Sequence, residues 1–140
     1  MSELKTGKVG EIITLLRLTQ IGKQADIVHV AGSDILVVDG KRTWRVQVKA
    51  SHIKRNGGNG DARRGYQFCV SKGLKPKRSL TYEDCDIVAL VAIEQERVMF
   101  VPVEHFKGVK TQRKKQIDFD QPYLESDTWD ACMVWYKNSM

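Results

Sequence analysis

The sequence predicts one α/β (α+β) domain that covers residues 1–140. The chain has 140 residues, the length of one ordinary globular domain, and contains no repeat, low-complexity tract or long linker. Apolar residues recur at helical spacing near the start, and short runs rich in β-branched residues follow between turn residues. A helix followed by several strands indicates a mixed fold.

The first predicted element is a helix that ends near Gly22. Leu15 and Leu18 lie on the side of this helix near Glu11, so its apolar surface covers much of the circumference. We therefore expect a largely buried helix with Glu11 directed into the molecule, and Gly7 one turn earlier leaving room for a backbone or a ligand. The other side carries a row of apolar residues at helical spacing: Val9, Ile12, Ile13 and Leu16.

Three strand-like runs follow, at residues 25–30, 34–38 and 43–50. The Asp-Gly turn between the second and third runs is a strong hairpin signal. If residues 39–42 all form the loop, Val38 faces Thr43 and Asp34 faces Gln47. If only two residues turn, Asp34 faces Arg45 instead, with Gln47 as its diagonal neighbour. Both registers keep Asp34 and Gln47 within reach of one ligand.

The second half of the chain alternates between basic segments and strands. Residues 53–65 hold four glycines and four basic residues without apolar periodicity, which is typical of a flexible basic surface loop. Strands are predicted at 66–71, 86–93 and 98–103, and a short helix at 104–107. The run at 86–93 is almost continuously apolar, as in a strand covered on both faces. A closing element is expected to contain Trp129, Trp135 and Tyr136.

Positive charge is concentrated in one part of the chain. The net charge is +6 and the pI is near 9.3. Between Lys41 and Arg78 there are twelve basic residues and one acid, Asp61. Such a segment attracts polyanions, and nucleic acid is the commonest polyanion that a cytosolic protein meets. A solvated face that serves only solubility is the alternative.

The sequence also indicates the compartment. No apolar run approaches the roughly 20 residues needed to span a bilayer, and the start lacks the apolar stretch of a secretory signal. Cys69, Cys85 and Cys132 form no regular ligand spacing, so we expect free thiols rather than a zinc site or disulfides. A cytoplasmic protein without a membrane span is expected.

Polar residues alternate with apolar ones along the predicted strand at 44–49. The core face has Trp44, Val46 and Val48, and the polar face has Arg45, Gln47 and Lys49. Burying a lysine is costly unless it is paired or lies at a wet cleft. With Asp34 on the neighbouring strand, a carboxylate, an amide and an ammonium group share one patch.

This patch suits phosphodiester hydrolysis, which needs a divalent cation to neutralise charge on the phosphate and activate a water. Mg²⁺ prefers hard oxygen ligands, and Mn²⁺ can substitute for it. Asp34 would supply a carboxylate oxygen, Gln47 its amide oxygen and Val48 its main-chain carbonyl. Lys49 would orient the water or stabilise the transition state.

The pattern Gly7-x3-Glu11, then Asp34, then Gln47-Val48-Lys49 resembles the PD-(D/E)XK nuclease superfamily. The segments SDILVVDGKRTWRVQVKAS and RVMFVPVEHF look more narrowly like the branch of group I intron-associated homing endonucleases. The similarity spans residues 7–106, about two thirds of the chain. The signature is short, and its specificity comes from residue order and strand context.

The resemblance implies a restriction-endonuclease-like core, a central mixed β-sheet flanked by helices, assembled as a homodimer or homotetramer. It implies a site in which Asp34 and Gln47 bind metal, Lys49 is the catalytic lysine and Glu11 is a helix-borne acid of the same site. Ser33 stands where many members have proline, which affects only the turn. Gln47 replaces an acid and binds Mg²⁺ more weakly, so Glu11 becomes more important as a second carboxylate.

The expected partner is double-stranded DNA, gripped by basic residues that mainly contact phosphates. These are Arg45, Lys54, Arg55, Arg63, Arg64, Lys75, Lys77 and Arg78. A single site cuts one strand at a time, so cutting a duplex implies a symmetric pair of sites. A Holliday-junction resolvase or other structure-specific nuclease is an alternative with the same chemistry. A non-catalytic DNA-binding module and a basic scaffold protein are alternatives of other classes.

Taken singly, the site residues have ordinary interpretations. Asp34 alone could be a turn residue, Lys49 an edge-strand charge and Glu11 a surface acid. The histidines His29, His52 and His105 lack the partner spacing of an HNH-type or zinc site, and we expect ordinary polar roles. His52, three residues past Lys49, is a candidate phosphate contact. Asp84 and Asp86 are expected to be turn acids.

Overall fold

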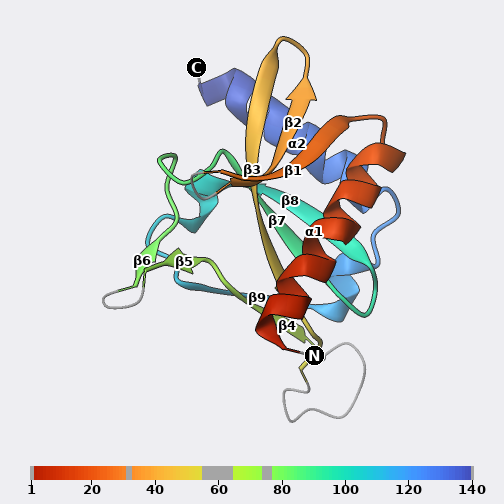
Figure 1. The fold of residues 1–140 in the computed structure, drawn as a ribbon, viewed down its shortest axis with the longest axis vertical. Coiled ribbons are helices and arrows are strands. Elements are labelled where there is room, and N and C mark those ends of the chain that lie inside the picture. Colours follow the sequence, from red (N-terminus) through yellow and green to blue (C-terminus); the bar gives the residue numbers. More distant parts are fainter. Residues whose placement is uncertain (1, 31–32, 55–64, 74–76, 140) are drawn as a thin grey trace.

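The computed structural model describes residues 2–30, 33–54, 65–73 and 77–139. Figure 1 shows how the elements are arranged. In chain order they are α1 (Glu3–Gln20), β1 (Gln24–Val30), β2 (Ser33–Asp39), β3 (Arg42–Ser51), β4 (Gly65–Cys69), β5 (Ser71–Lys72), β6 (Arg78–Ser79), β7 (Ile87–Ala92), β8 (Arg97–Pro102), η2 (Val103–Phe106), β9 (Thr111–Lys115), η3 (Gln116–Phe119) and α2 (Leu124–Ser139).

The central sheet has five strands in the order β1-β2-β3-β7-β8. Strands β3 and β7 are parallel, and the other neighbouring strands are antiparallel, so the sheet is mixed. Helices α1 and α2 lie against it (Figure 1). The prediction of an α+β fold with a central mixed sheet and flanking helices is confirmed.

Strand β7 lies in the middle of the core because both of its faces are covered. All of its residues are buried, as the continuous apolar run at 86–93 predicted. Ile87 and Ala89 join the cluster that contains Trp129 of α2, together with residues of α1. Val88 belongs to a second cluster with Phe68 of β4. The helices therefore pack on one face of the sheet, and the β4 segment packs on the other.

The hairpin of β2 and β3 adopts the first of the two predicted registers. Val38 pairs with Thr43, and Ile35 pairs with Val46. The ladder continues to Asp39 and Arg42, so the turn is shorter than the predicted four-residue loop. Gly40 in the turn has a φ of +69°, which glycine adopts without strain.

Helix α1 ends next to Gly22 as its sequence predicts, and Ser2 caps its start. The Ser2 hydroxyl accepts a hydrogen bond from the Lys5 amide at 3.3 Å, and Gly22 follows the helix with a φ of +83°. A Cβ at Gly10 would lie 2.6 Å from the Ala50 Cβ, so the absence of a side chain lets α1 approach β3 closely.

The prediction that α1 is largely buried is wrong for one side of the helix. Ile13 and Leu18 are buried, whereas Ile12 and Leu16 are 52% and 53% exposed. The apolar positions fit two overlapping faces, and the close contact at Gly10 selects one of them. A Cβ added at Gly7 would meet no described residue within 4 Å, so Gly10 is the packing glycine.

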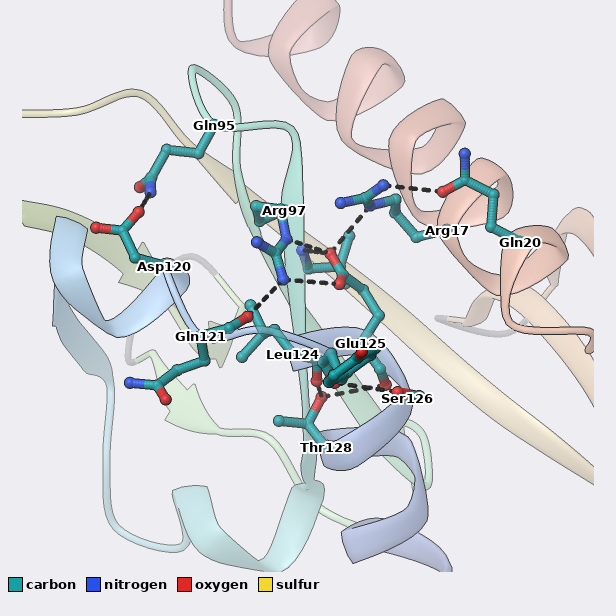
Figure 2. A network of polar contacts seen from close by, with 12 residues as sticks. Arg17, Gln20, Gln95, Arg97, Asp120, Gln121, Leu124, Glu125, Ser126 and Thr128 are labelled. Atoms are coloured by element: carbon teal, nitrogen blue, oxygen red, sulfur yellow. Dashed lines mark hydrogen bonds and ion pairs between the residues drawn. The ribbon is translucent and has the colours of Figure 1, made fainter.

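The buried carboxylate of Glu125 links helix α2 to the sheet through hydrogen bonds. The Glu125 Oε1 atom accepts hydrogen bonds from Arg17 Nε at 3.0 Å and from Arg97 Nε at 2.9 Å (Figure 2). It also accepts from the Val98 amide at 3.1 Å. One turn later, Thr128 Oγ1 accepts from the Phe100 amide at 3.1 Å. Helix α2 therefore satisfies two backbone amides of the edge strand β8.

Aromatic residues of α2 form the closing element that the sequence predicted. Trp129 is fully buried, and its indole Nε1 donates to Asp39 Oδ2 at 2.7 Å. The ring centroids of Tyr136 and Trp44 lie 4.8 Å apart, and those of Trp135 and His105 lie 4.7 Å apart. The C-terminal helix thus reaches both the β2–β3 hairpin and the end of β8.

The basic strand β9 pairs with β4 in a two-stranded ribbon. Strand β9 was not predicted; it pairs antiparallel with β4, so Gln67 lies opposite Arg113 and Gly65 opposite Lys115. The predicted loop at 53–65 lies mostly outside the described residues, which include only its two ends. In the described part of the chain, no helix is long and apolar enough to cross a membrane.

Candidate active site

Asp34 lies where β2 and β3 separate. Their ladder ends at Ile35 and Val46, and Asp34 is the next residue of β2. The Asp34 Oδ2 atom accepts a hydrogen bond from the Val48 amide at 2.8 Å. The carboxylate therefore sits against the backbone of β3, between the two residues Gln47 and Lys49 that the sequence assigned to the site.

A bulge in β1 brings a third residue to this point. The pairing of β1 with β2 shifts between Ile27 and Val30, so Val28 and His29 together lie opposite Asp34. His29 has a φ of +54°, in the left-handed region that few residues other than glycine adopt. The bulge turns the imidazole toward Asp34, and His29 Nδ1 lies 3.8 Å from Asp34 Oδ1.

Glu11 reaches the same point from α1. Its residue is 9% exposed, and its Oε1 atom lies 3.1 Å from His29 Nε2. This contact lacks hydrogen-bond geometry, so the buried Oε1 atom has no hydrogen-bond partner among the described residues. Burial and the nearby charge of Asp34 raise the pKa of Glu11, while the charges of His29 and Lys8 act in the opposite direction.

The three side chains form a compact cluster of possible metal ligands. One ligand atom each from Glu11, His29 and Asp34 lies within 4.8 Å of the others. The predicted approach of Glu11 to Asp34 is therefore present in the structure. The two carboxylates come from α1 and β2, and the bulge of β1 supplies the imidazole.

Gln47 and Lys49 flank the residue that Asp34 binds. The amide oxygen of Gln47 is buried without a hydrogen-bond partner among the described residues. Lys49 is half-buried, and within the described ranges no carboxylate lies at ion-pair distance from its ammonium group. Both side chains thus remain available for a ligand. Burying a polar atom without a partner costs free energy. Such atoms are found where a ligand completes the site.

The residues present fit a divalent cation. Two carboxylates, one with a raised pKa, and an unpartnered amide oxygen supply the hard donors that Mg²⁺ prefers. A cation between Glu11 and Asp34 would relieve the repulsion that their charges exert on each other.

The predicted DNA-binding residues fall into three groups. Lys54 and Lys77 are exposed. Arg45 and Arg78 instead form ion pairs with buried acids, Arg45 with Asp86 at 3.2 Å and Arg78 with Asp84 at 2.9 Å. The remaining predicted contacts lie outside the described residues: Arg55, Arg63, Arg64 and Lys75.

Asp84 and Asp86 do more than shape a turn. Both are buried, and hydrogen bonds from Arg78 hold the pKa of Asp84 well below its ordinary value despite that burial. Asp86 also accepts a hydrogen bond from the Arg45 amide at 2.9 Å. These acids therefore organise basic side chains before β7. Neither belongs to the cluster of Glu11, His29 and Asp34.

The other histidines have structural partners. His52, the candidate phosphate contact, has Nδ1 2.7 Å from Glu94 Oε2 and Nε2 3.2 Å from Thr6 Oγ1. His29 is the site residue that the sequence analysis missed. A tight connection between the first two predicted strands could have placed His29 near Asp34, but the bulge that aims its ring leaves no sequence signal.

The fold belongs to a class seen in a bacterial nuclease. The solved structure of a bacterial homing endonuclease, I-Ssp6803I, matches with a TM-score of 0.71 over 99% of this chain and 97% of that chain. The sequences are 16% identical, so the likeness concerns the fold alone. No protein-family model and no curated protein matches the sequence.

Proposed function

We propose that this protein is a site-specific, magnesium-dependent DNA endonuclease of the homing type, with the active-site plan of the PD-(D/E)XK superfamily. The observation that carries the proposal is the meeting of Glu11 and Asp34 beside the Gln47-Val48-Lys49 strand. The fold shared with a bacterial homing endonuclease supports it.

In this proposal Glu11, Asp34 and Gln47 hold the cation, with the Val48 carbonyl as a further oxygen. When bound, Mg²⁺ supplies positive charge to the phosphate and lowers the pKa of the attacking water. The hydrogen bond from the Val48 amide fixes the Asp34 carboxylate, so its second oxygen can face the ligand. Lys49 contributes its ammonium group to orient the water or to stabilise charge on the phosphate in the transition state.

The DNA is proposed to lie along the basic side chains near the end of β3. Exposed Lys54 follows that strand, and the β4–β9 ribbon begins beside it with Gly65 opposite Lys115. Such side chains would mainly contact phosphates and set the register of the duplex. Because one site cuts one strand, cleavage of both strands calls for a homodimer or homotetramer.

A cleavage assay on a supercoiled plasmid library with random inserts tests the proposal. We expect nicked and linear products with Mg²⁺ and none with EDTA, and sequencing of the new ends should recover a shared target. Lys49→Ala should reduce cleavage by about 10³-fold or more and leave most of the DNA affinity. Lys137→Ala, which changes an exposed lysine at the end of α2, is the matched control.

Full activity of Lys49→Ala, or cleavage that persists in EDTA, would contradict the proposal. A four-way junction is tested beside the linear duplex, since preferential cutting of the junction would indicate a resolvase instead. Binding of DNA that is unchanged by Mg²⁺, without any cleavage, would indicate a non-catalytic DNA-binding module.

A further inference from the structure

We infer that His29 is a direct metal ligand, which makes the site bind a transition-metal ion more tightly than it binds Mg²⁺. The inference rests on the proposed function, which places a cation between Glu11 and Asp34. It goes beyond that function because it adds a nitrogen donor to the oxygen ligands. The sequence pattern of the site contains no such residue.

The backbone of β1 is shaped to deliver this imidazole. The bulge adds one residue opposite Asp34, and His29 itself has the left-handed φ of +54°. A side chain other than glycine adopts this conformation at some cost in free energy, about 1 kcal/mol or more. Bulges next to active sites commonly re-aim a side chain. Here the re-aimed ring faces two carboxylates.

Each ring nitrogen of His29 lies at ion-pair distance from a carboxylate, and neither contact has hydrogen-bond geometry. His29 Nδ1 is 3.8 Å from Asp34 Oδ1, beyond hydrogen-bond distance, and Nε2 is 3.1 Å from Glu11 Oε1 without hydrogen-bond geometry. Glu11 is nine-tenths buried and its Oε1 atom lacks a hydrogen-bond partner among the described residues. A cation could take all three donor atoms, since they lie within 4.8 Å of one another.

The donor set decides which metals bind best. Carboxylate and carbonyl oxygens suit Mg²⁺, whereas imidazole nitrogen favours later divalent ions such as Co²⁺, Ni²⁺ and Zn²⁺. One imidazole beside two carboxylates resembles the mixed donor sets of transition-metal sites. The His29 side chain is 53% exposed, so the ring can adjust toward an incoming ion.

Titration calorimetry with Co²⁺ and with Mg²⁺, on the full chain without DNA, tests the inference. We expect wild-type protein to bind Co²⁺ more tightly than Mg²⁺. His29→Asn should weaken Co²⁺ binding by about tenfold or more and change Mg²⁺ binding by less than about threefold. Asparagine tolerates the left-handed conformation, so this variant removes the imidazole and keeps the backbone.

A second readout tests whether the His29 imidazole binds the ion. In the Co²⁺ protein, the imidazole protons of a ligating His29 should give strongly shifted nuclear magnetic resonance signals that disappear in His29→Asn. His105→Asn is the matched control, because His105 packs edge-to-face against Trp135 and is not part of the cluster. Asp34→Asn should weaken the binding of both ions, which assigns the binding to this site.

Equal Co²⁺ affinity in His29→Asn and wild type would overturn the inference. Tighter binding of both ions in His29→Asn would also overturn it, because His29 would then only neutralise the carboxylates. If the protein cleaves DNA with Mg²⁺ but His29→Asn does not change Co²⁺ binding, the proposed function is supported and the inference about His29 is wrong. Binding of Co²⁺ through His29 without any cleavage would contradict only the proposed function.

Discussion

The two long helices each bury one glutamate, and the two are treated in opposite ways. Glu125 of α2 accepts hydrogen bonds from two arginines and a backbone amide. Burial alone would raise the pKa of Glu125, but these hydrogen bonds hold that pKa below its ordinary value. Glu11 of α1 meets a second carboxylate instead, and burial with that neighbour raises its pKa.

The contrast separates a carboxylate that stabilises the fold from one that we propose binds a cation. A buried carboxylate whose charge is balanced stabilises the packing of its helix, whereas one beside another carboxylate opposes folding until a cation arrives. We therefore expect the charge of Glu125 to stabilise the fold without affecting cleavage, and the charge of Glu11 to support cleavage while it destabilises the metal-free protein. The following measurements test that division.

The largest expected effect is on DNA cleavage by Glu11→Gln. Loss of one carboxylate from the cation site should lower the Mg²⁺-dependent cleavage rate by about 10³-fold, equivalent to about 4 kcal/mol. Glu125→Gln, assayed well below its melting temperature, should cleave at the wild-type rate. Comparable losses in both variants would remove the distinction between the two glutamates.

The second-largest expected effect is a loss of stability in Glu125→Gln. Removing the charge leaves Arg17 and Arg97 without their shared counter-charge, so the free energy of unfolding should fall by about 3 kcal/mol. Both arginines reach solvent, which keeps the loss near the lower end for buried pairs. Urea denaturation measures it, with Asp130→Asn as an exposed control on the same helix. A loss no larger than that of the control would show that the network contributes little.

Lowering the pH should remove the contribution that Glu125 makes to the free energy of unfolding. Because its folded-state pKa lies below the ordinary value of 4.5, the stabilisation is complete above pH 4.5. It is lost as the pH falls through the lowered folded-state pKa. The unfolding free energy of the wild type should therefore fall more steeply below pH 4.5 than that of Glu125→Gln. Parallel curves for the two proteins would contradict the assignment.

The smallest expected effect is a gain in stability. In metal-free protein at neutral pH, Glu11→Gln should raise the free energy of unfolding by about 1 kcal/mol, because the repulsion from Asp34 disappears. Calorimetric melting in EDTA measures the change. Added Mg²⁺ should stabilise the wild type and not the variant. A lower melting temperature for metal-free Glu11→Gln would mean that the charge of Glu11 is already balanced.

Local patterns were enough to predict much of the fold. The Asp-Gly turn predicted the β2–β3 hairpin, and the apolar run at 86–93 predicted a strand buried on both faces. Strand β9 was missed because its sequence, TQRKK, has no apolar alternation. Its pairing with β4 depends on contacts between distant segments. The buried side of α1 was missed for the same reason, since Gly10 is fixed by its contact with Ala50.

The candidate site was predicted in part. The order Glu11, Asp34, Gln47 and Lys49 indicated a shared pocket, and the structure brings Glu11 and Asp34 together. The role of each residue in catalysis stays a prediction. His29 was not foreseen, because a bulge depends on the register of two strands and its sequence carries no turn signal. Residue order can thus predict which strands meet, but not which side chain a local irregularity redirects.

The hydrogen bonds that α2 accepts from β8 have a consequence for self-association. Along this outer strand, the amides of Val98 and Phe100 are already taken by Glu125 and Thr128, and Pro102, next in the same alternation, has no amide hydrogen. A neighbouring molecule thus finds no free donors at these three positions with which to lengthen the sheet. Backbone pairing along this strand is therefore disfavoured, which protects it from the edge-to-edge association that leads to aggregates.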